Sequence, residues 1–153
     1  MKIEQIRDDD KKKEVTREIL EALPEWFGIP EAREEYIEKS AGGLFWCAYE
    51  GEQAVGFLCL NETGKATVEL YVMGILKAYH RKGIGRLLFD AAKETAKEQG
   101  YSFIQVKTVQ MGRYEEYDCT NRFYFSLGFK EFEVFPTLWD EWNPCQIYVM
   151  ALD

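Results

Sequence analysis

Residues 79–86 read YHRKGIGR and connect an apolar, strand-like run at 67–76 to an amphipathic, helix-like run that begins near Gly83. Two glycines separated by one residue allow the backbone to pass close to a ligand. The first turn of a helix leaves backbone N–H groups unpaired and carries the positive end of the helix dipole. With Arg81, Lys82 and Arg86 close by, this stretch predicts an anion-binding turn whose expected ligand is a phosphate or pyrophosphate.

The two glycines are also compatible with a simple tight connection between a strand and a helix. Their spacing does not fit the phosphate loop GxxxxGK(S/T). It does not fit the dinucleotide fingerprint GxGxxG either, because Leu88 stands where the third glycine would be. The spacing therefore argues against a phosphate-loop nucleoside triphosphatase and a Rossmann dehydrogenase.

The composition indicates one globular domain spanning residues 1–153. A content of 46% hydrophobic and 15% aromatic residues is enough for a substantial core. The formal net charge of -8 argues against nucleic acid as a partner, because phosphate backbones repel an acidic surface. Four scattered cysteines and the single histidine, His80, form no zinc, redox or other metal-binding pattern. We expect reduced cysteines and no metal.

The sequence contains no apolar run near the ~18 residues that a membrane span needs, and its start lacks the apolar core of a signal peptide. We therefore expect a cytoplasmic protein with no membrane partner. Whether it is a monomer or a homodimer stays open.

Hydrophobic periodicity predicts alternating helices and strands. Residues 68–75 form the central strand, with residues 68, 70 and 72 on one face and residues 69, 71 and 73 on the other. The helix after Gly83 ends at Gly100, and a strand at 103–109 completes a right-handed parallel crossover. The other predicted elements are an edge strand at 2–7, helices near 15–23, 31–40 and 120–126, a hairpin of 44–49 and 54–60, a turn at 61–65, and a final antiparallel pair at 129–135 and 146–151.

A second motif, FYFSLGF, occupies residues 123–129. With the glycine turn placed before it, the sequence resembles the GCN5-related N-acetyltransferase (GNAT) superfamily over residues 3–152, most strongly over 67–129. The resemblance implies an α/β fold with a mixed, mostly antiparallel twisted sheet of about six to seven strands, helices on both faces and one parallel pair around the cofactor helix. It also implies that the cofactor is acetyl-CoA.

In this family the pyrophosphate of the cofactor lies on the glycine turn, and its pantetheine arm pairs with the end of the preceding strand. The turn would bind mainly through backbone N–H groups, so the departures from the family pattern at Lys77 and His80 do not prevent binding. His80 makes a pH-sensitive contribution conceivable. The resemblance implies these cofactor residues: Met73, Ile75, His80, Arg81, Lys82, Gly83, Ile84, Gly85 and Arg86.

Glu69 lies eleven residues before His80, where part of the family has a glutamate general base. A carboxylate in the middle of an apolar strand should have a raised pKa, and it can take a proton from an ammonium directly or through water. A solvated strand glutamate or a structural ion pair is the alternative for this position.

Tyr124 occupies the position of the tyrosine that, in many family members, protonates the departing thiolate of coenzyme A. The alternative is an aromatic side chain packed between Phe123 and Phe125. The family often has an asparagine where Tyr117 stands, so that cofactor contact stays open.

Two loops rich in aromatic and acidic residues, at 25–27 and 136–144, correspond to loops that flank the acceptor groove in similar folds. We expect Trp26, Phe27, Trp139 and Asp140 to bind the substrate, unless the tryptophans cap the core instead. Together with the acidic residues at 115–118, these loops favour a positively charged amine.

The sequence thus predicts an acetyl-CoA-dependent N-acetyltransferase that transfers an acetyl group to a primary amine, a small cationic one, by direct attack in a ternary complex. Two alternatives are a catalytically idle acyl-CoA-binding module, which would need neither Glu69 nor Tyr124, and an acetyltransferase for protein or peptide amines. A covalent acyl-cysteine enzyme is disfavoured because no cysteine accompanies His80 in the motif.

Overall fold

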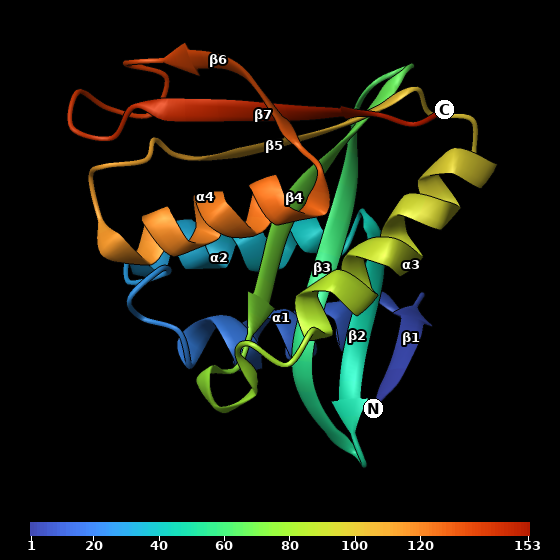
Figure 1. Ribbon diagram of the computed structural model, residues 1–153. Coiled ribbons are helices and arrows are strands. Elements are labelled where there is room, and N and C mark those ends of the chain that lie inside the picture. The colour runs from blue at the N-terminus through green and yellow to red at the C-terminus, as the bar shows by residue number, and fades with distance from the viewer.

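The computed structural model describes all residues, 1–153, and contains one seven-stranded sheet in the order β1-β2-β3-β4-β5-β7-β6 (Figure 1). All neighbouring strands are antiparallel except β4 and β5, which are parallel. The predicted fold class is confirmed. The strands are β1 (Lys2–Ile6), β2 (Leu44–Glu50), β3 (Gln53–Gly64), β4 (Thr67–Ile75), β5 (Phe103–Val109), β6 (Lys130–Phe135) and β7 (Cys145–Ala151).

Helices cover both faces of the sheet, with α3 and α4 on one face and α1 and α2 on the other (Figure 1). Local sequence signals fix their ends. The side chain of Asp8 caps α1 by accepting a hydrogen bond from the backbone N–H of Lys11, and Gly128 ends α4 in the left-handed conformation. The helices are α1 (Asp9–Glu21), α2 (Pro30–Ser40), the short 3-10 helix η1 (Lys77–Tyr79), α3 (Ile84–Glu98) and α4 (Glu115–Leu127). None of them is long and apolar enough to cross a membrane.

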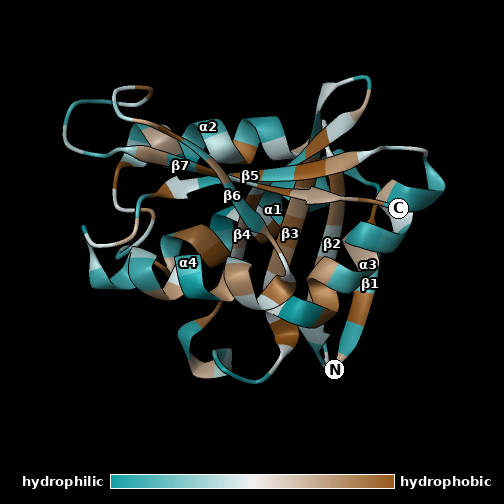
Figure 2. Ribbon diagram, turned by 45° about the horizontal axis from the view of Figure 1, so that its top comes forward, coloured by the Kyte–Doolittle hydropathy of each residue, from teal (hydrophilic) through white to brown (hydrophobic).

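Two apolar cores lie on the two faces of the sheet, and the central strand β3 is largely hydrophobic in Figure 2 because it contributes residues to both. The larger core lies under α3 and α4 and includes Leu88, Phe89 and Tyr148, all of which are fully buried. The smaller core lies under α1 and includes Ile19 and Phe57. Burying these side chains is the main stabilising contribution to the fold, at about 1.5–3 kcal/mol for each large one.

A β-bulge in β4 changes which residues share a face. Cys59 of β3 lies opposite Val72, and the next residue, Leu60, lies opposite Leu70, so Tyr71 is the extra residue. As a consequence, Leu70 packs in the larger core and Val72 in the smaller one. The prediction that residues 68, 70 and 72 share one face is therefore wrong for residue 72, which faces the opposite core.

The strand β3 is longer than predicted. It continues to Gly64 and pairs there with Thr67 of β4. The predicted turn at 61–65 is therefore wrong, because most of these residues extend the β3–β4 ladder.

The parallel pair of β4 and β5 is short. Thr67–Glu69 pair with 103–105, after which β4 continues along β3 to Ile75 and β5 continues along β7 to Val109. Figure 1 shows the two strands diverging from this point. The sheet therefore opens into a wedge directly after Glu69.

Candidate active site

A groove with a volume of about 1430 Å³ occupies the wedge between β4 and β5. Its walls come from β4, the turn at 79–86, the end of β5 and α4, together with the α1–α2 loop and the β6–β7 loop. Segments far apart in the sequence thus meet around one cavity. Among the predicted site residues, those that line it are Trp26, Phe27, Met73, Ile75, His80, Arg81, Gly83, Ile84, Gly85, Arg86, Tyr124, Trp139 and Asp140.

The two glycines of the turn have different structural roles. Gly83 has a φ of 80°, in the left-handed region, and no atom lies within 4 Å of where its Cβ would stand. A Cβ on Gly85, by contrast, would lie 2.8 Å from Cζ of Phe123. Gly83 thus permits the turn and leaves open space beside it, and Gly85 allows α3 to pack against α4.

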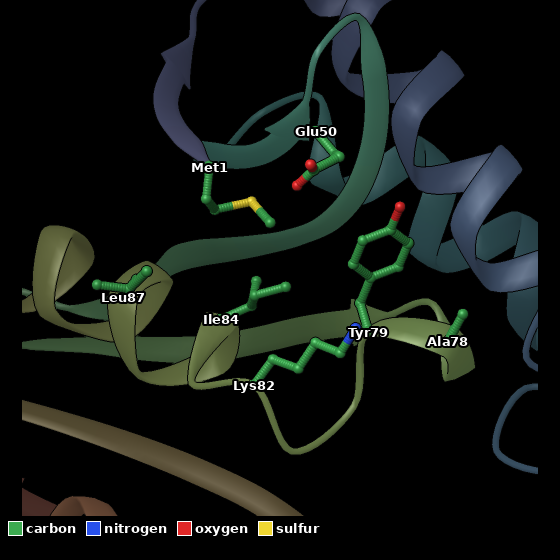
Figure 3. Close-up of a pocket in the computed structure, with 7 residues that line it drawn as sticks. All are labelled: Met1, Glu50, Ala78, Tyr79, Lys82, Ile84 and Leu87. Carbon is green, nitrogen blue, oxygen red and sulfur yellow. The ribbon is translucent and has the colours of Figure 1, made fainter.

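The positive residues of the turn point in different directions. Nη2 of Arg86 donates a hydrogen bond to the carbonyl of Ser126 at 2.8 Å, near the end of α4. The ammonium of Lys82 lies 5.4 Å from the ring centroid of Tyr79. Lys82 lines a separate pocket of about 430 Å³, next to Met1 and Glu50, and not the groove (Figure 3).

His80 occupies part of the strand edge that was predicted to bind pantetheine. Its Nε2 lies 2.6 Å from the carbonyl oxygen of Ile75, and because a carbonyl only accepts, Nε2 carries the proton. The ring of His80 also makes an edge contact with Trp26, at 5.8 Å between centroids. The carbonyl of Ile75 is thus already hydrogen-bonded within the chain.

The loop between α1 and α2 is bound to both sides of the groove. Nε1 of Trp26 donates to the carbonyl of Glu116 at 3.3 Å, and the hydroxyl of Tyr117 donates to the carbonyl of Trp26 at 3.0 Å. Glu25 forms an ion pair with Lys77, which lowers the pKa of the Glu25 carboxyl. The polar atoms of Trp26 therefore hold the loop in place, and Tyr117 takes part in this contact.

The loop between β6 and β7 is closed by the carboxylate of Asp140. It accepts hydrogen bonds from the backbone N–H groups of Trp142 and Asn143, both at 2.8 Å, and from the side chain of Asn143 at 3.0 Å. The Asn143 amide holds the pKa of Asp140 below its usual value, with help from the Trp142 N–H. Trp139 and Trp142 are 46% and 67% exposed, so neither caps the core.

Tyr124 is 6% exposed, belongs to the larger core and lines the groove. Its ring packs against Phe123, Phe129 and Tyr148. Its hydroxyl makes no hydrogen bond within the chain, and burial raises its pKa. Tyr124 therefore combines a packed ring with a hydroxyl that stays protonated at neutral pH.

Glu69 lies at the apex of the wedge and does not line the groove. Its side chain is 13% exposed and forms an ion pair with Lys107, at 3.3 Å between Oε2 and Nζ. Burial raises the pKa of Glu69, and Lys107 opposes this shift. The structural ion pair considered above is thus present, and Lys107 is the partner that faces the groove.

Comparisons with known proteins agree with this geometry. The model of the acetyltransferase (GNAT) family matches residues 12–129. The chain belongs to the GNAT family. Among curated relatives, YsnE of Bacillus subtilis (strain 168), an uncharacterised N-acetyltransferase, is 29% identical over 101 residues, or 65% of each protein. A second curated relative, a mycothiol acetyltransferase of Jonesia denitrificans, is 42% identical over 53 residues, or 34% of this chain and 17% of that protein, so the chain spans less than two thirds of the length of either relative.

Solved structures of GNAT proteins share the fold of this chain. A putative GNAT acetyltransferase from Desulfovibrio desulfuricans has a TM-score of 0.84 at 19% identity, with 99% of each chain covered. An aminoglycoside 6'-N-acetyltransferase in complex with coenzyme A has a TM-score of 0.80 at 18% identity, with 100% of this chain and 98% of that chain covered. The prediction of a GNAT acetyltransferase fold is confirmed.

In this GNAT chain, three cations that line the groove were not predicted from the sequence: Arg33 on α2, Lys107 on β5 and Arg122 on α4. Arg122 directly precedes the FYFSLGF motif, and this position is the one sequence signal that could have placed any of the three cations at the groove. Arg33 and Lys107 reach the groove only through the packing of α2 and the divergence of β5. No local pattern in the sequence marks either of them.

Proposed function

We propose that the chain is an acetyl-CoA-dependent N-acetyltransferase that transfers the acetyl group directly to a primary amine. The observation that carries this proposal is the single groove in the wedge between β4 and β5. The glycine turn lies along this groove, and so do the α1–α2 and β6–β7 loops. Such a groove accommodates a thioester and an amine at once, and positioning the two reactants is the main source of catalysis.

The groups for the chemical step are Tyr124 and Glu69. The amine nitrogen attacks the thioester carbonyl carbon, the C–S bond breaks, and the electron pair leaves on sulfur. The hydroxyl of Tyr124 gives its proton to the thiolate, and Glu69 accepts the proton of the amine through water. Glu69 acts at a distance because its carboxylate lies at the apex of the wedge.

The acceptor is a small amine that is cationic in solution. Glu115 and Glu116 support this part of the proposal, because both line the groove and neither forms an ion pair within the chain. Carboxylates at the mouth of a cleft attract an ammonium group electrostatically. Asp140 also lines the groove and stays ionised, but its carboxylate accepts hydrogen bonds within its own loop and so is less free than Glu115 and Glu116 to bind the amine directly.

The direct test measures thiol release from acetyl-CoA with a panel of polyamines, amino acids, aminoglycosides and peptide amines. We expect release that depends on the amine and a preference for small amines. Acetyl-CoA binding without amine-dependent release would instead identify an acyl-CoA-binding module. A preference for peptide amines would indicate a protein acetyltransferase.

The pH dependence of Glu69→Gln tests the proposed general base. The pKa of Glu69 is raised by burial, so the wild-type rate should fall as the pH drops through an ionisation above the ordinary carboxyl range. The rate of Glu69→Gln should not show this fall at low pH. At high pH it should be about a hundredfold below the wild-type rate, the usual size of a general-base contribution. The profiles of wild type and variant should converge at low pH.

The measurement is kcat/KM from pH 5 to 9 with an amine of low basicity, so that the amine itself stays unprotonated. Lys107→Met is a second test, because it keeps the carboxylate and removes the group that lowers its pKa, so the fall in rate should move to higher pH. Parallel profiles for wild type and Glu69→Gln would show that solvent takes the proton.

A further inference from the structure

The groove contains an arginine without an ion-pair partner. Arg33 on α2 is half-buried and lines the groove. Its Nη1 donates to the carbonyl of Phe27 at 3.1 Å, but its Nε is buried and makes no hydrogen bond. The adjacent carboxylate, Glu34, is bound by Arg17 through two contacts of 2.7 and 2.8 Å.

An unpaired, half-buried guanidinium is unfavourable because desolvated charges need compensating partners. The chain has 27 acidic residues against 19 lysines and arginines, yet none of its carboxylates forms an ion pair with Arg33. Arg17 is the residue that binds the Glu34 carboxylate and mainly lowers its pKa, and Arg33 is close enough to add to this shift. A carboxylate ligand would supply the missing charge partner at Nη2, which makes no hydrogen bond within the chain and, unlike Nε, is not enclosed.

The neighbours of Arg33 in the groove are also hydrogen-bond donors. Tyr36 follows three residues later on the same helix face, and its ring lies 5.2 Å from that of Tyr71 on β4. Burial raises the pKa of Tyr36 to about 12 and also raises that of Tyr71, so both hydroxyls stay protonated. This part of the groove is therefore rich in donors.

None of the carboxylates near the groove forms an ion pair with Arg33. Glu25 pairs with Lys77, Glu69 pairs with Lys107, and Asp140 accepts hydrogen bonds within its own loop. The unpaired carboxylates, Glu115 and Glu116, belong to the first turn of α4, whereas Arg33 belongs to α2. The groove thus offers negative and positive groups from different elements.

We infer that the amine acceptor also carries a carboxylate and that Arg33 binds it, which makes amino acids and related amino-carboxylic acids the substrate class. The inference rests on the proposed function and narrows it. The ammonium group of such a zwitterion is attracted by the acidic start of α4, and its carboxylate binds the guanidinium. Arg33 is then a specificity-determining residue of the groove.

The test compares amino acids with their carboxamides, which keep the amine and lose the carboxylate. We expect kcat/KM for thiol release to favour the acid at least tenfold in the wild type, the usual size of a charge-assisted hydrogen bond. Arg33→Gln should abolish this preference by lowering the rate of the acid alone, and Arg33→Lys should restore part of it. The acid-to-amide ratio of kcat/KM is compared between wild type and variants. The two substrates differ in amine basicity, but this difference is the same for every variant and therefore cancels.

Arg113→Gln is the matched control, because Arg113 is exposed and does not line the groove. It should keep the wild-type preference. An equal loss for acid and amide in a folded Arg33→Gln protein, or a wild type that uses both equally, would overturn the inference and leave the proposed function intact. Absence of thiol release with every amine would overturn both.

Discussion

Gly83→Val is expected to weaken acetyl-CoA binding by about 2–4 kcal/mol, or roughly thirty- to thousandfold. Gly83 adopts a φ of 80°, which a β-branched residue does not tolerate, and the space beside it is open to a ligand. Valine would distort the turn, fill this space and remove backbone N–H groups from their binding positions. Isothermal titration calorimetry with acetyl-CoA measures the effect.

Gly51→Val provides a control with the same backbone strain. Gly51 has a φ of 61°, also has no atom within 4 Å of its Cβ position, and lies in the turn between β2 and β3. Both variants should lose about 1–3 kcal/mol of stability through strain, but only Gly83→Val should lose cofactor affinity. Unchanged affinity in a folded Gly83→Val protein would place the pyrophosphate elsewhere.

Tyr124→Phe is expected to lower kcat by about ten- to ten-thousandfold and to leave the affinity for acetyl-CoA nearly unchanged. Tyr124 lines the groove and its hydroxyl has no hydrogen-bond partner within the chain, so removal of the hydroxyl leaves no other group unsatisfied. The free energy of unfolding should therefore stay close to that of the wild type. Steady-state kinetics and thermal melting measure the two effects.

Tyr148→Phe is the matched control for Tyr124→Phe. The two rings pack 6.0 Å apart, but the hydroxyl of Tyr148 donates to Oδ1 of Asn121 at 2.5 Å and Tyr148 does not line the groove. Its loss should cost about 1–2 kcal/mol of stability and leave kcat unchanged. Full turnover in Tyr124→Phe would reduce Tyr124 to a packing residue.

The elements of the fold were predictable because their signals are local. Periodic apolar residues mark α3, and Gly83 and Gly128 mark a helix start and a helix end. The bulge at Tyr71 was not predictable, because register depends on the partner strand and not on the strand itself. The same reason explains why the full length of β3 was missed.

Site residues that belong to short sequence motifs could be predicted, whereas contacts between residues far apart in the sequence could not, because they depend on packing. Tyr124 and the turn residues other than Lys82 come from short motifs, and the structure brings them to one groove. The contacts of Trp26 with Glu116 and Tyr117 join residues about 90 positions apart. The lack of an ion-pair partner for Arg33 also depends on the whole fold, because the fold pairs nearby carboxylates such as Glu34 with other cations.

The short parallel ladder between β4 and β5 also affects how stability is distributed in the molecule. Strands β1–β4 and strands β5–β7 form two hydrogen-bonded units that are joined by the residue pairs at 67–69 and 103–105 and by hydrogen bonds from the N–H groups of Ser102 and Phe103 to the carbonyl of Ala66. Beyond Glu69 the edge of β4 that faces β5 has no strand partner, whereas β2 and β7 are paired on both sides, so amide protons of β4 beyond Glu69 should exchange faster than those of β2 or β7. Any ligand that contacts both units slows this exchange and makes the two halves unfold more cooperatively.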